Sequence, residues 1–248
     1  MPNIHSSISF ALVNIPVAMN PIIKNNDTAF NQLHKKCMHR IKYIKFCPVC
    51  KKDIKETDIV KGYEYERNKY LVFTKDELQK IKPNNEKEIE VVSFININEV
   101  DPTYFEKSFF LESDAKSKPY ILFYEALKKT KKVALCKTVI GTKFYYCILR
   151  LNKNGIIMTT LYFDEEVNIP EEQINKKINE KELSLAIKLI DSLTGHFEPI
   201  KYYDEYQDKI KDAINNKLEG KAIKTSKKKS KKKINDLMEA LEKSLKKK

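Results

Sequence analysis

Four residues in the N-terminal third of the chain have types and spacing that could bind a metal ion. They form the pattern His34-x2-Cys37-x9-Cys47-x2-Cys50. A Cys-x2-Cys turn presents two thiolates to one tetrahedral ion, and the upstream His-x2-Cys can supply the other two ligands. Imidazole and thiolate suit zinc, and four protein ligands leave no position for a reacting water. The pattern therefore predicts a structural zinc ion. His39 is a rival for the fourth position, and the alternative is a metal-free hairpin with reduced cysteines.

No set of residues predicts catalysis. The histidines at positions 5, 34, 39 and 196 lie in unrelated settings, and the five glycines form neither a phosphate-binding loop nor a nucleophile elbow. Carboxylates gather at residues 164–166 and 171–172, where metal binding is conceivable. We interpret them instead as solvated residues after a strand and at the start of a helix. The sequence thus predicts a binding protein and not an enzyme.

Basic residues indicate a polyanionic partner. The chain of 248 residues has a formal charge of +13; residues 216–248 contain 13 lysines and four acidic residues, a net +9 that leaves +4 for the first 215. Such a tail suits nucleic acid, although it could also serve solubility alone. The candidate DNA-binding residues are Lys35, Lys36, Arg40, Lys42 and Lys45 beside the predicted zinc site, then Lys131 and Lys132, and in the tail Lys227, Lys228, Lys229, Lys231, Lys232 and Lys233.

The type of basic residue predicts how nucleic acid would be bound. Only three arginines occur against 44 lysines. Arginine is favoured for bidentate reading of guanine, whereas lysine suits phosphate as a point charge. The composition therefore favours backbone contact without sequence preference. The alternative for the basic residues of the body is a general lysine bias in composition.

The elements that must position these residues are mostly strands. Residues 133–140, 144–151 and 156–163 are rich in β-branched, aromatic and aliphatic residues, and turn signals at Gly141 and Gly155 separate them. This meander needs further strands to close its edges. We expect strands at residues 7–13, ended before Pro16, and at 40–46, 62–65, 70–73, 88–95 and 108–111. Short helices are expected after the capping box Thr74-x2-Glu77 and over 119–130, so the pattern favours a β-barrel.

After Pro170 the hydrophobic period changes to that of helices. Two helical patterns run from Leu183 to Leu193 and from Tyr206 to Leu218, and a lysine-rich linker follows. A last short segment has apolar residues on one helical face: Leu237, Met238, Leu241 and Leu245. A helix this short is marginally stable alone, so we expect this face to pack against a partner. We therefore expect a mainly β fold with α appendages. Its parts are a β-barrel core over 1–180 with an inserted zinc-ribbon-like hairpin near 34–50, a helical arm over 181–220, and a lysine-rich linker with a terminal amphipathic helix over 221–248.

Several features of the sequence indicate where in the cell the protein is found. No run of about 18 apolar residues occurs, and the first residues do not read as a secretory signal. Five cysteines, unevenly spread, argue against a secreted disulfide framework. We expect a soluble cytoplasmic protein, associated with the nucleoid, with no membrane partner.

Taken together, several stretches resemble the bacterial Ku family. They are Ser7-Ile-Ser-Phe-Ala-Leu-Val-Asn-Ile-Pro-Val17, Phe30-Asn-Gln-Leu-His-Lys-Lys-Cys37, Ile59-Val-Lys-Gly-Tyr-Glu-Tyr65, Thr159-Thr-Leu-Tyr-Phe163, Phe197-Glu-Pro-Ile-Lys-Tyr-Tyr-Asp-Glu-Tyr206 and Asp236-Leu-Met-Glu-Ala-Leu241. They cover nearly the whole chain in the family's order. Two departures stand out: Ala11 replaces the usual glycine of the opening strand, and Met38-His39 replace the glycines after the first cysteine.

The resemblance implies a β-barrel core with helical arms, paired into a ring-shaped homodimer. Ends of double-stranded DNA would thread through that ring, held by the sugar-phosphate backbone, and the bound dimer would recruit ligase D for non-homologous end joining in double-strand break repair. The metal cluster is not present in every member, so zinc would be scaffolding. The alternative function is a zinc-ribbon nucleoid or transcription-associated DNA-binding protein without preference for ends.

Overall fold

The computed structural model describes residues 4–81, 88–113, 117–170 and 179–223. The chain divides into two compact units. Unit 1 comprises Met1–Asn25 and Asn31–Ile169, and unit 2 comprises Asn26–Phe30 and Pro170–Lys248. Among the described residues, every strand lies in unit 1, and helices α3 and α4 lie in unit 2.

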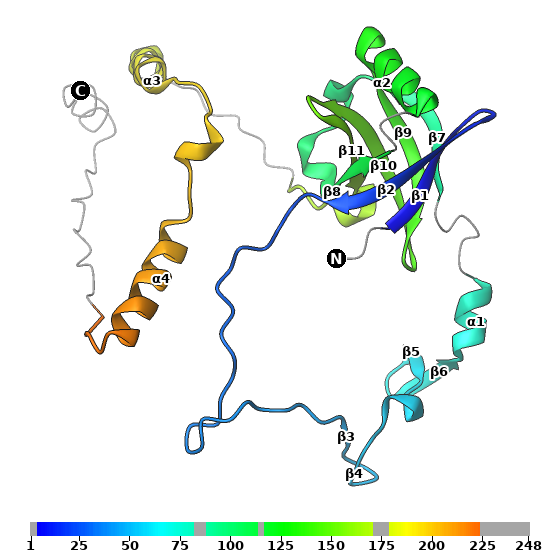
Figure 1. The fold of residues 1–248 in the computed structure, drawn as a ribbon, viewed down its shortest axis with the longest axis vertical. Helices are drawn as coiled ribbons and strands as arrows, with labels where there is room; N and C mark the ends of the chain where they lie inside the picture. Colours follow the sequence, from blue (N-terminus) through cyan, green and yellow to red (C-terminus); the bar gives the residue numbers. More distant parts are fainter. Residues whose placement is uncertain (1–3, 82–87, 114–116, 171–178, 224–248) are drawn as a thin grey trace. The chain divides into compact units, whose positions relative to one another are not determined.

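Unit 1 is built on a closed β-barrel, which confirms the expected fold class (Figure 1). Its strand order is β1-β2-β8-β11-β10-β9-β7, and a short parallel pairing of β1 with β7 closes it, whereas the other neighbours are antiparallel. Closure leaves no edge strand to template aggregation. The strands are β1 (Ile4–Phe10), β2 (Val13–Pro21), β7 (Glu88–Ile95), β8 (Phe105–Glu112), β9 (Val133–Ile140), β10 (Lys143–Asn152) and β11 (Gly155–Leu161).

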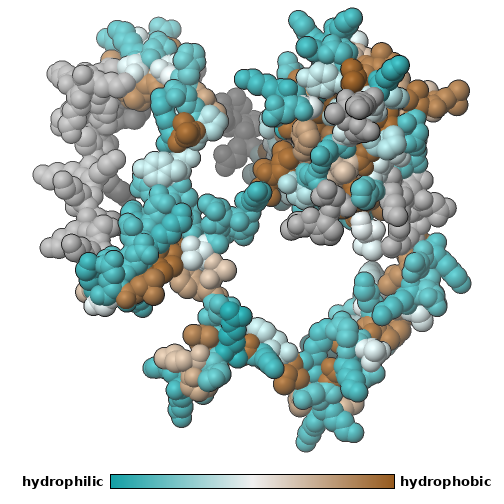
Figure 2. Space-filling view, in the orientation of Figure 1, coloured by the Kyte–Doolittle hydropathy of each residue, from teal (hydrophilic) through white to brown (hydrophobic). Residues whose placement is uncertain are grey.

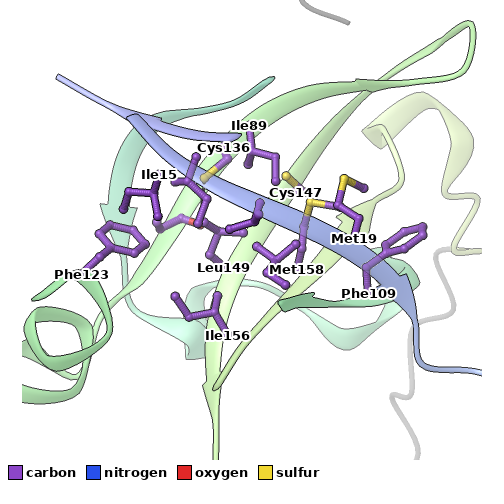
Figure 3. Packing of buried hydrophobic residues seen from close by; sticks show 14 of the residues in the cluster. Ile15, Met19, Ile89, Phe109, Phe123, Cys136, Cys147, Leu149, Ile156 and Met158 are labelled. Atoms are coloured by element: carbon purple, nitrogen blue, oxygen red, sulfur yellow. Dashed lines mark hydrogen bonds between the residues drawn. The ribbon is translucent and has the colours of Figure 1, made fainter. Parts of the chain in front are cut away.

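The meander expected over residues 133–163 forms the best-buried wall of this barrel. Strand β11 is buried along nearly its whole length, and Leu149 of β10 is fully buried. Figure 3 shows side chains from several strands converging with Phe123 of helix α2 (Lys118–Thr130). Each large side chain removed from water in this way contributes roughly 1.5–3 kcal/mol. The strands therefore hold one another in a single register.

Two cysteines lie in this core, as the sequence predicted. Cys136 of β9 lies opposite Cys147 of β10, and both are fully buried and not disulfide-bonded. The hydrogen bond with the Cys147 thiol and the burial both raise the pKa of the Cys136 thiol. Cys136 therefore stays protonated and serves as a small apolar core residue.

Tyr120 fastens helix α2 to the barrel. Its hydroxyl donates to the Leu111 carbonyl of β8 (2.9 Å) and accepts from the Ile156 N–H of β11 (3.0 Å). The hydroxyl thus satisfies two backbone groups, one on each of two neighbouring strands. Burial raises the pKa of Tyr120, so the hydroxyl remains a donor.

The N-terminal strand prediction is wrong at Pro16. The expected single strand over residues 7–13 is a hairpin: β1 ends at Phe10, Ala11 and Leu12 form the turn, and Pro16 lies inside β2 opposite Ser7. Counted from the closing pair Phe10–Val13, Pro16 falls at a pair that exchanges no backbone hydrogen bonds. The missing N–H therefore costs the ladder nothing, which is how a proline is tolerated in a strand.

Between β2 and β7 the chain of unit 1 runs outside the barrel in a long insert, defined here as residues 31–81. None of its residues is buried. The expected strand over 40–46 is also wrong, since Arg40 makes only an isolated bridge with Leu33. The insert holds β3 (Phe46–Cys47), β4 (Lys52–Asp53), β5 (Lys61–Glu66), β6 (Lys69–Phe73) and α1 (Lys75–Lys80), whose capping box at Thr74 and Glu77 is as predicted.

Unit 2 holds α3 (Glu180–Leu193) and α4 (Glu205–Leu218), which confirms the helical patterns of that region. Asp204 caps α4 by accepting from the N–H groups of Tyr206 and Gln207. The buried Gln207 side chain accepts from both the backbone and the hydroxyl of Thr28, which ties residues 26–30 to this helix. Short 3-10 turns complete the structure at Glu56–Asp58, Ile97–Glu99, Pro102–Tyr104, Asp164–Glu166 and Pro199–Lys201.

Candidate nucleic-acid interface

A basic hollow of about 390 Å³ opens on the barrel where α2 ends and β9 begins. We call it the basic hollow; no acidic residue lines it, and it includes both body lysines that the sequence singled out at 131 and 132. Its lining residues are Ile97, Leu127, Lys128, Lys131, Lys132, Val133, Arg150 and Leu151.

Local structure explains why these side chains meet. Helix α2 ends at Thr130, and Lys131 adopts the left-handed conformation (φ 55°) that turns the chain into β9. The hairpin register of β9 and β10 pairs Ala134 with Leu149, so Arg150 arrives beside the start of β9. Lys132 is oriented by a hydrogen bond from its ammonium group to the Asn96 side-chain oxygen (2.8 Å).

Three lysines elsewhere on the barrel form ion pairs with carboxylates. Glu106, Glu90 and Glu166 lie 3.1, 2.9 and 3.1 Å from the ammonium groups of the lysines at 107, 137 and 143. Hydrogen bonds to these carboxylates raise the pKa of all three lysines. In the hollow Lys132 has only a neutral amide as its partner, and Lys128 lies 3.7 Å from Glu125. The hollow therefore gathers four cationic side chains in one place, and no carboxylate lies in its lining.

The hollow suits a phosphate group. Lysine ammonium groups act as point charges toward phosphate oxygens, and the guanidinium of Arg150 can bind two of them at once. Cations at a helix C-terminus also complement the helix dipole, which accounts for Lys128 and Lys131 but not for Arg150 on a strand. Ile97 and Leu127 are apolar residues in the lining of the hollow. They lower the local dielectric constant, which strengthens interactions between charges there.

Sequence reasoning missed Lys128 and Arg150. Arg150 lies between two leucines of a strand, where it reads as an isolated outward residue. A signal was nevertheless present: counting pairs back from the tight turn at Gly141 places residue 150 opposite residue 133, next to the two predicted lysines. Lys128 lies in the last turn of α2, three residues before Lys131, and this closeness in the sequence was its signal.

The predicted cations of the insert form a group of their own. Lys35, Lys36, Arg40 and Lys42 are exposed in or beside the turn that follows Leu33. Lys45 is committed to an ion pair with Glu56, and this contact lowers the pKa of that carboxyl group. No insert residue lines the basic hollow.

The predicted metal ligands lie in two pairs. The His34 Nδ1 is 3.1 Å from the Cys37 sulfur, and the Cys50 N–H donates to the Cys47 sulfur (3.4 Å). The N–H groups of Cys50 and Val49 lower the pKa of the Cys47 thiol, whereas the neighbouring Cys47 raises the pKa of Cys50. Among the described residues no group of three or more such side chains is close enough to share an ion. The structure thus brings His34 close to Cys37 and Cys47 close to Cys50 but does not join the two pairs. Zinc binding stays a prediction.

The tail predictions lie outside the described residues. These are the lysines at 227, 228, 229, 231, 232 and 233 and the apolar stripe of Leu237, Met238, Leu241 and Leu245. Within the described part of the chain, no helix has both the length and the apolar character needed to cross a membrane.

Comparisons with known proteins agree with this architecture. The family model for the Ku70/Ku80 beta-barrel domain matches residues 9–185. The chain is 39% identical to the non-homologous end joining protein Ku of Lachnoclostridium phytofermentans, covering 98% of this chain and 95% of that protein. It is 40% identical to the Ku protein of Bacillus subtilis over 81% of this chain and 66% of that protein, and 34% identical to that of Desulfitobacterium hafniense over 96% and 85%. The barrel and these relatives together show that the chain belongs to the Ku family.

Proposed function

We propose that this protein binds the ends of double-stranded DNA without sequence preference and acts in non-homologous end joining. The observation that carries the proposal is the basic hollow on a Ku-family barrel, because it gathers three lysines and an arginine with no acidic residue in its lining. Relatives that match nearly the whole chain are named for this repair process. The protein acts by binding, without catalysis of its own.

Lysine-dominated contacts support binding to the DNA backbone. Phosphate contacts fix position without reading bases, and each one releases counterions from the duplex. Three of the four basic side chains in the hollow are lysines. Direct reading of bases would instead call for arginine, asparagine or glutamine in a groove.

We further propose that two copies form a ring, since the insert lacks a core of its own. The hairpin of β5 and β6 is exposed at every residue but Phe73, and an isolated two-stranded hairpin is only marginally stable in water. Helix α3 likewise buries no residue, and its Ile190 and Leu193 are both 64% exposed. Figure 2 shows hydrophobic surface on segments outside the barrel. A second copy would cover such surfaces, and encirclement would explain how a body with little net charge retains DNA.

Recruitment of ligase D completes the proposal. The exposed apolar face of α3 and the terminal apolar stripe are the surfaces offered for dimer packing or ligase docking. The lysine-rich linker would contact phosphates of the DNA duplex that lies next to the ring. Truncation after Gly220 should then lower the salt slope of DNA binding by about 0.9 for each lost phosphate contact.

The decisive experiment compares linear and covalently closed duplexes of equal length. A ring that loads through an end should shift the linear fragment and leave the closed minicircle free in a gel-shift assay with excess unlabelled circle. Equal binding of both would contradict the proposal and favour a nucleoid or transcription-associated protein without end preference. Degradation of either duplex upon addition of magnesium or manganese would show an enzyme and would contradict it as well.

Substitutions in the basic hollow test where the DNA is held. Lys131→Gln and Arg150→Gln should each weaken binding to linear DNA and reduce the salt slope by about 0.9. Lys137→Gln is the matched control, because the charge of that lysine is compensated by Glu90, which lies 2.9 Å away. Equal losses in the control and in the hollow variants would show that the hollow has no special role.

A further inference from the structure

The basic hollow holds more positive charge than one internal phosphate of DNA can neutralise. Its lining contains the side chains of Lys128, Lys131, Lys132 and Arg150, and among the residues that line it there is no carboxylate and no imidazole. Glu125 lies 3.7 Å from Lys128 and offsets part of one charge. An internal phosphate is a diester with a single negative charge. The hollow is therefore better matched to an anion of higher charge.

The donors in the hollow also exceed what a diester can accept. The guanidinium of Arg150 can donate two parallel hydrogen bonds to two oxygens of one phosphate, and each lysine ammonium has three further donors. A diester has only two oxygens outside its ester bonds, and the guanidinium can engage both. A phosphate monoester has three such oxygens and a charge of about −1.5 to −2 near pH 7. Its third oxygen is the acceptor that Lys131 and Lys132 can share.

The backbone at Lys131 is an independent observation. Lys131 follows helix α2 in the left-handed conformation (φ 55°, ψ 25°). Glycine is favoured at such a position, because a Cβ is strained there. Lysine keeps the strain and places a long cationic side chain in the lining of the hollow. We interpret this strain as a sign that the side chain at 131 has a role in binding, beyond ending the helix.

The other lining residues suit the group that carries a phosphate. Ile97, Val133 and Leu151 provide apolar surface against which a sugar ring can pack. The volume of about 390 Å³ lies in the range of small-ligand sites. An internal phosphate has neighbouring nucleotides on both sides, whereas a terminal phosphate has a neighbour on one side only. A terminal or free phosphate can therefore enter this concave site more deeply.

We infer that the basic hollow binds a phosphate monoester, the group found at a 5′-phosphorylated DNA terminus and on a free mononucleotide. Arg150 binds two of its oxygens, and Lys131 and Lys132 bind the third. Lys132 is already oriented by its hydrogen bond to Asn96 (2.8 Å), which lowers the entropy lost on binding. For the DNA terminus the inference rests on the proposed function, because it assigns the last nucleotide of the bound end to the hollow.

The first measurement uses the full chain and two linear duplexes of one sequence, with 5′-phosphates or with 5′-hydroxyls. The phosphorylated duplex should bind about two- to fivefold more tightly in a gel-shift titration, the range for ion pairs open to solvent. Lys131→Gln and Arg150→Gln should abolish this difference, whereas the control Lys137→Gln should retain it, because Glu90 compensates that lysine. The ratio of the two affinities is taken within each variant, so a general loss of DNA binding does not alter it.

The same ratio should depend on pH. The second pKa of a phosphate monoester is about 6, so the group is mostly a dianion at about pH 8 and mostly a monoanion at about pH 5. Lysine and arginine side chains carry their charge at both values. The hydroxyl-terminated duplex is measured at each pH as the reference, which cancels any titration of Glu125 beside Lys128. The preference for the phosphorylated end should be present at about pH 8 and lost as the pH falls through about 6.

A second measurement separates a DNA terminus from a free mononucleotide. Isothermal titration calorimetry of the full chain compares thymidine 5′-monophosphate, a monoester, with thymidine 3′,5′-cyclic monophosphate, a diester of the same nucleoside. Stronger binding of the monoester, lost in Lys131→Gln, supports a hollow that takes free mononucleotides. A preference seen only between the two duplexes supports a hollow that takes the DNA terminus.

Equal affinities within both pairs of probes would overturn the inference. A preference that persists unchanged in Lys131→Gln and Arg150→Gln, or at about pH 5, would overturn it as well. These results leave the proposed function intact, since that depends on the comparison of linear and closed duplexes. Failure to bind linear DNA would instead contradict the proposed function, and the calorimetric comparison would still test the hollow.

Discussion

The barrel and the insert belong to the same unit but are stabilised in opposite ways. In the barrel, side chains such as Ile8, Ile89 and Leu149 are completely buried and join all the strands into one core. In the insert no described residue is buried, although its sequence contains many tyrosines, valines and isoleucines. Hydrophobic composition alone therefore does not make a core; the residues must also have a closed surface to pack against.

The barrel and the insert therefore offer different kinds of surface, one fixed by a core and one without a core. The barrel carries the basic hollow on side chains whose positions are set by the strand register. The insert instead consists of turns and short hairpins that share no buried residue. Local stability is lowest where binding partners complete the structure, as is common for recognition segments. The following substitutions compare the two regions pairwise.

The largest contrast is expected from removing a buried side chain. Leu149→Ala should lower the free energy of unfolding by about 2–5 kcal/mol, because it leaves a cavity beneath α2 and the meander. Leu71→Ala in the insert should change it by no more than about 0.5 kcal/mol, since Leu71 is 53% exposed. Urea unfolding followed by far-UV circular dichroism measures both. Similar losses in the two variants would mean that the insert is part of the cooperative core.

Glycine positions offer a second contrast. A Cβ at Gly155 would lie 2.9 Å from Phe110 and 3.0 Å from the Tyr120 hydroxyl, and φ there is +149°. Gly155→Ala should therefore destabilise the barrel by about 2–3 kcal/mol through strain and crowding. At Gly62 in the insert the nearest atom to an added Cβ would be 3.4 Å away, an ordinary contact. Gly62→Ala should be nearly neutral in thermal unfolding, and a large loss there would contradict the contrast.

Tyrosine hydroxyls give a third and smaller contrast. Tyr120→Phe should cost about 1–2 kcal/mol, because the N–H of Ile156 and the carbonyl of Leu111 lose their partner inside the barrel. Tyr43→Phe removes a hydrogen bond to Gln32 on the exposed insert, where water replaces it. Chemical denaturation of the two variants should differ by at least about 1 kcal/mol. Equal effects would show that Tyr120 is solvated in solution.

Sequence reasoning succeeded for elements that local patterns define, both in the barrel and at α1 of the insert. Alternation and turn residues located all three strands of the meander, and the capping box at Thr74 located α1. These features depend on neighbours in the chain, which a sequence displays directly. Helix α2 was found from Pro119 at its start for the same reason.

The failures depend on contacts between distant residues. Pro16 in β2 is tolerated only because of the pairing with β1, and the basic hollow exists only because β10 returns Arg150 to the start of β9. The candidate metal ligands were predicted from their spacing, but the described residues show them only as two separate pairs, so zinc binding stays a prediction. Composition predicted lysine contacts with nucleic acid, whereas the place where Lys131, Lys132 and Arg150 meet could be found only with the strand register.

The smallest effect is a gain in stability at the turn between β1 and β2. Ala11 adopts the left-handed conformation (φ 52°), which favours glycine. A Cβ is strained there by about 1–2 kcal/mol, while glycine costs about 0.5–1 kcal/mol in chain entropy. Ala11→Gly should therefore stabilise the barrel by about 0.5–1 kcal/mol and raise its melting temperature.

The matched change in the insert is Asn68→Gly. Asn68 has φ 62° in the turn between β5 and β6, but asparagine tolerates this conformation well. Because the insert shares no buried residue with the barrel, this substitution should leave the melting transition unmoved. Scanning calorimetry measures the melting temperature of both variants. A higher melting temperature for Asn68→Gly, or a lower one for Ala11→Gly, would contradict the idea that turn strain affects the barrel and not the insert.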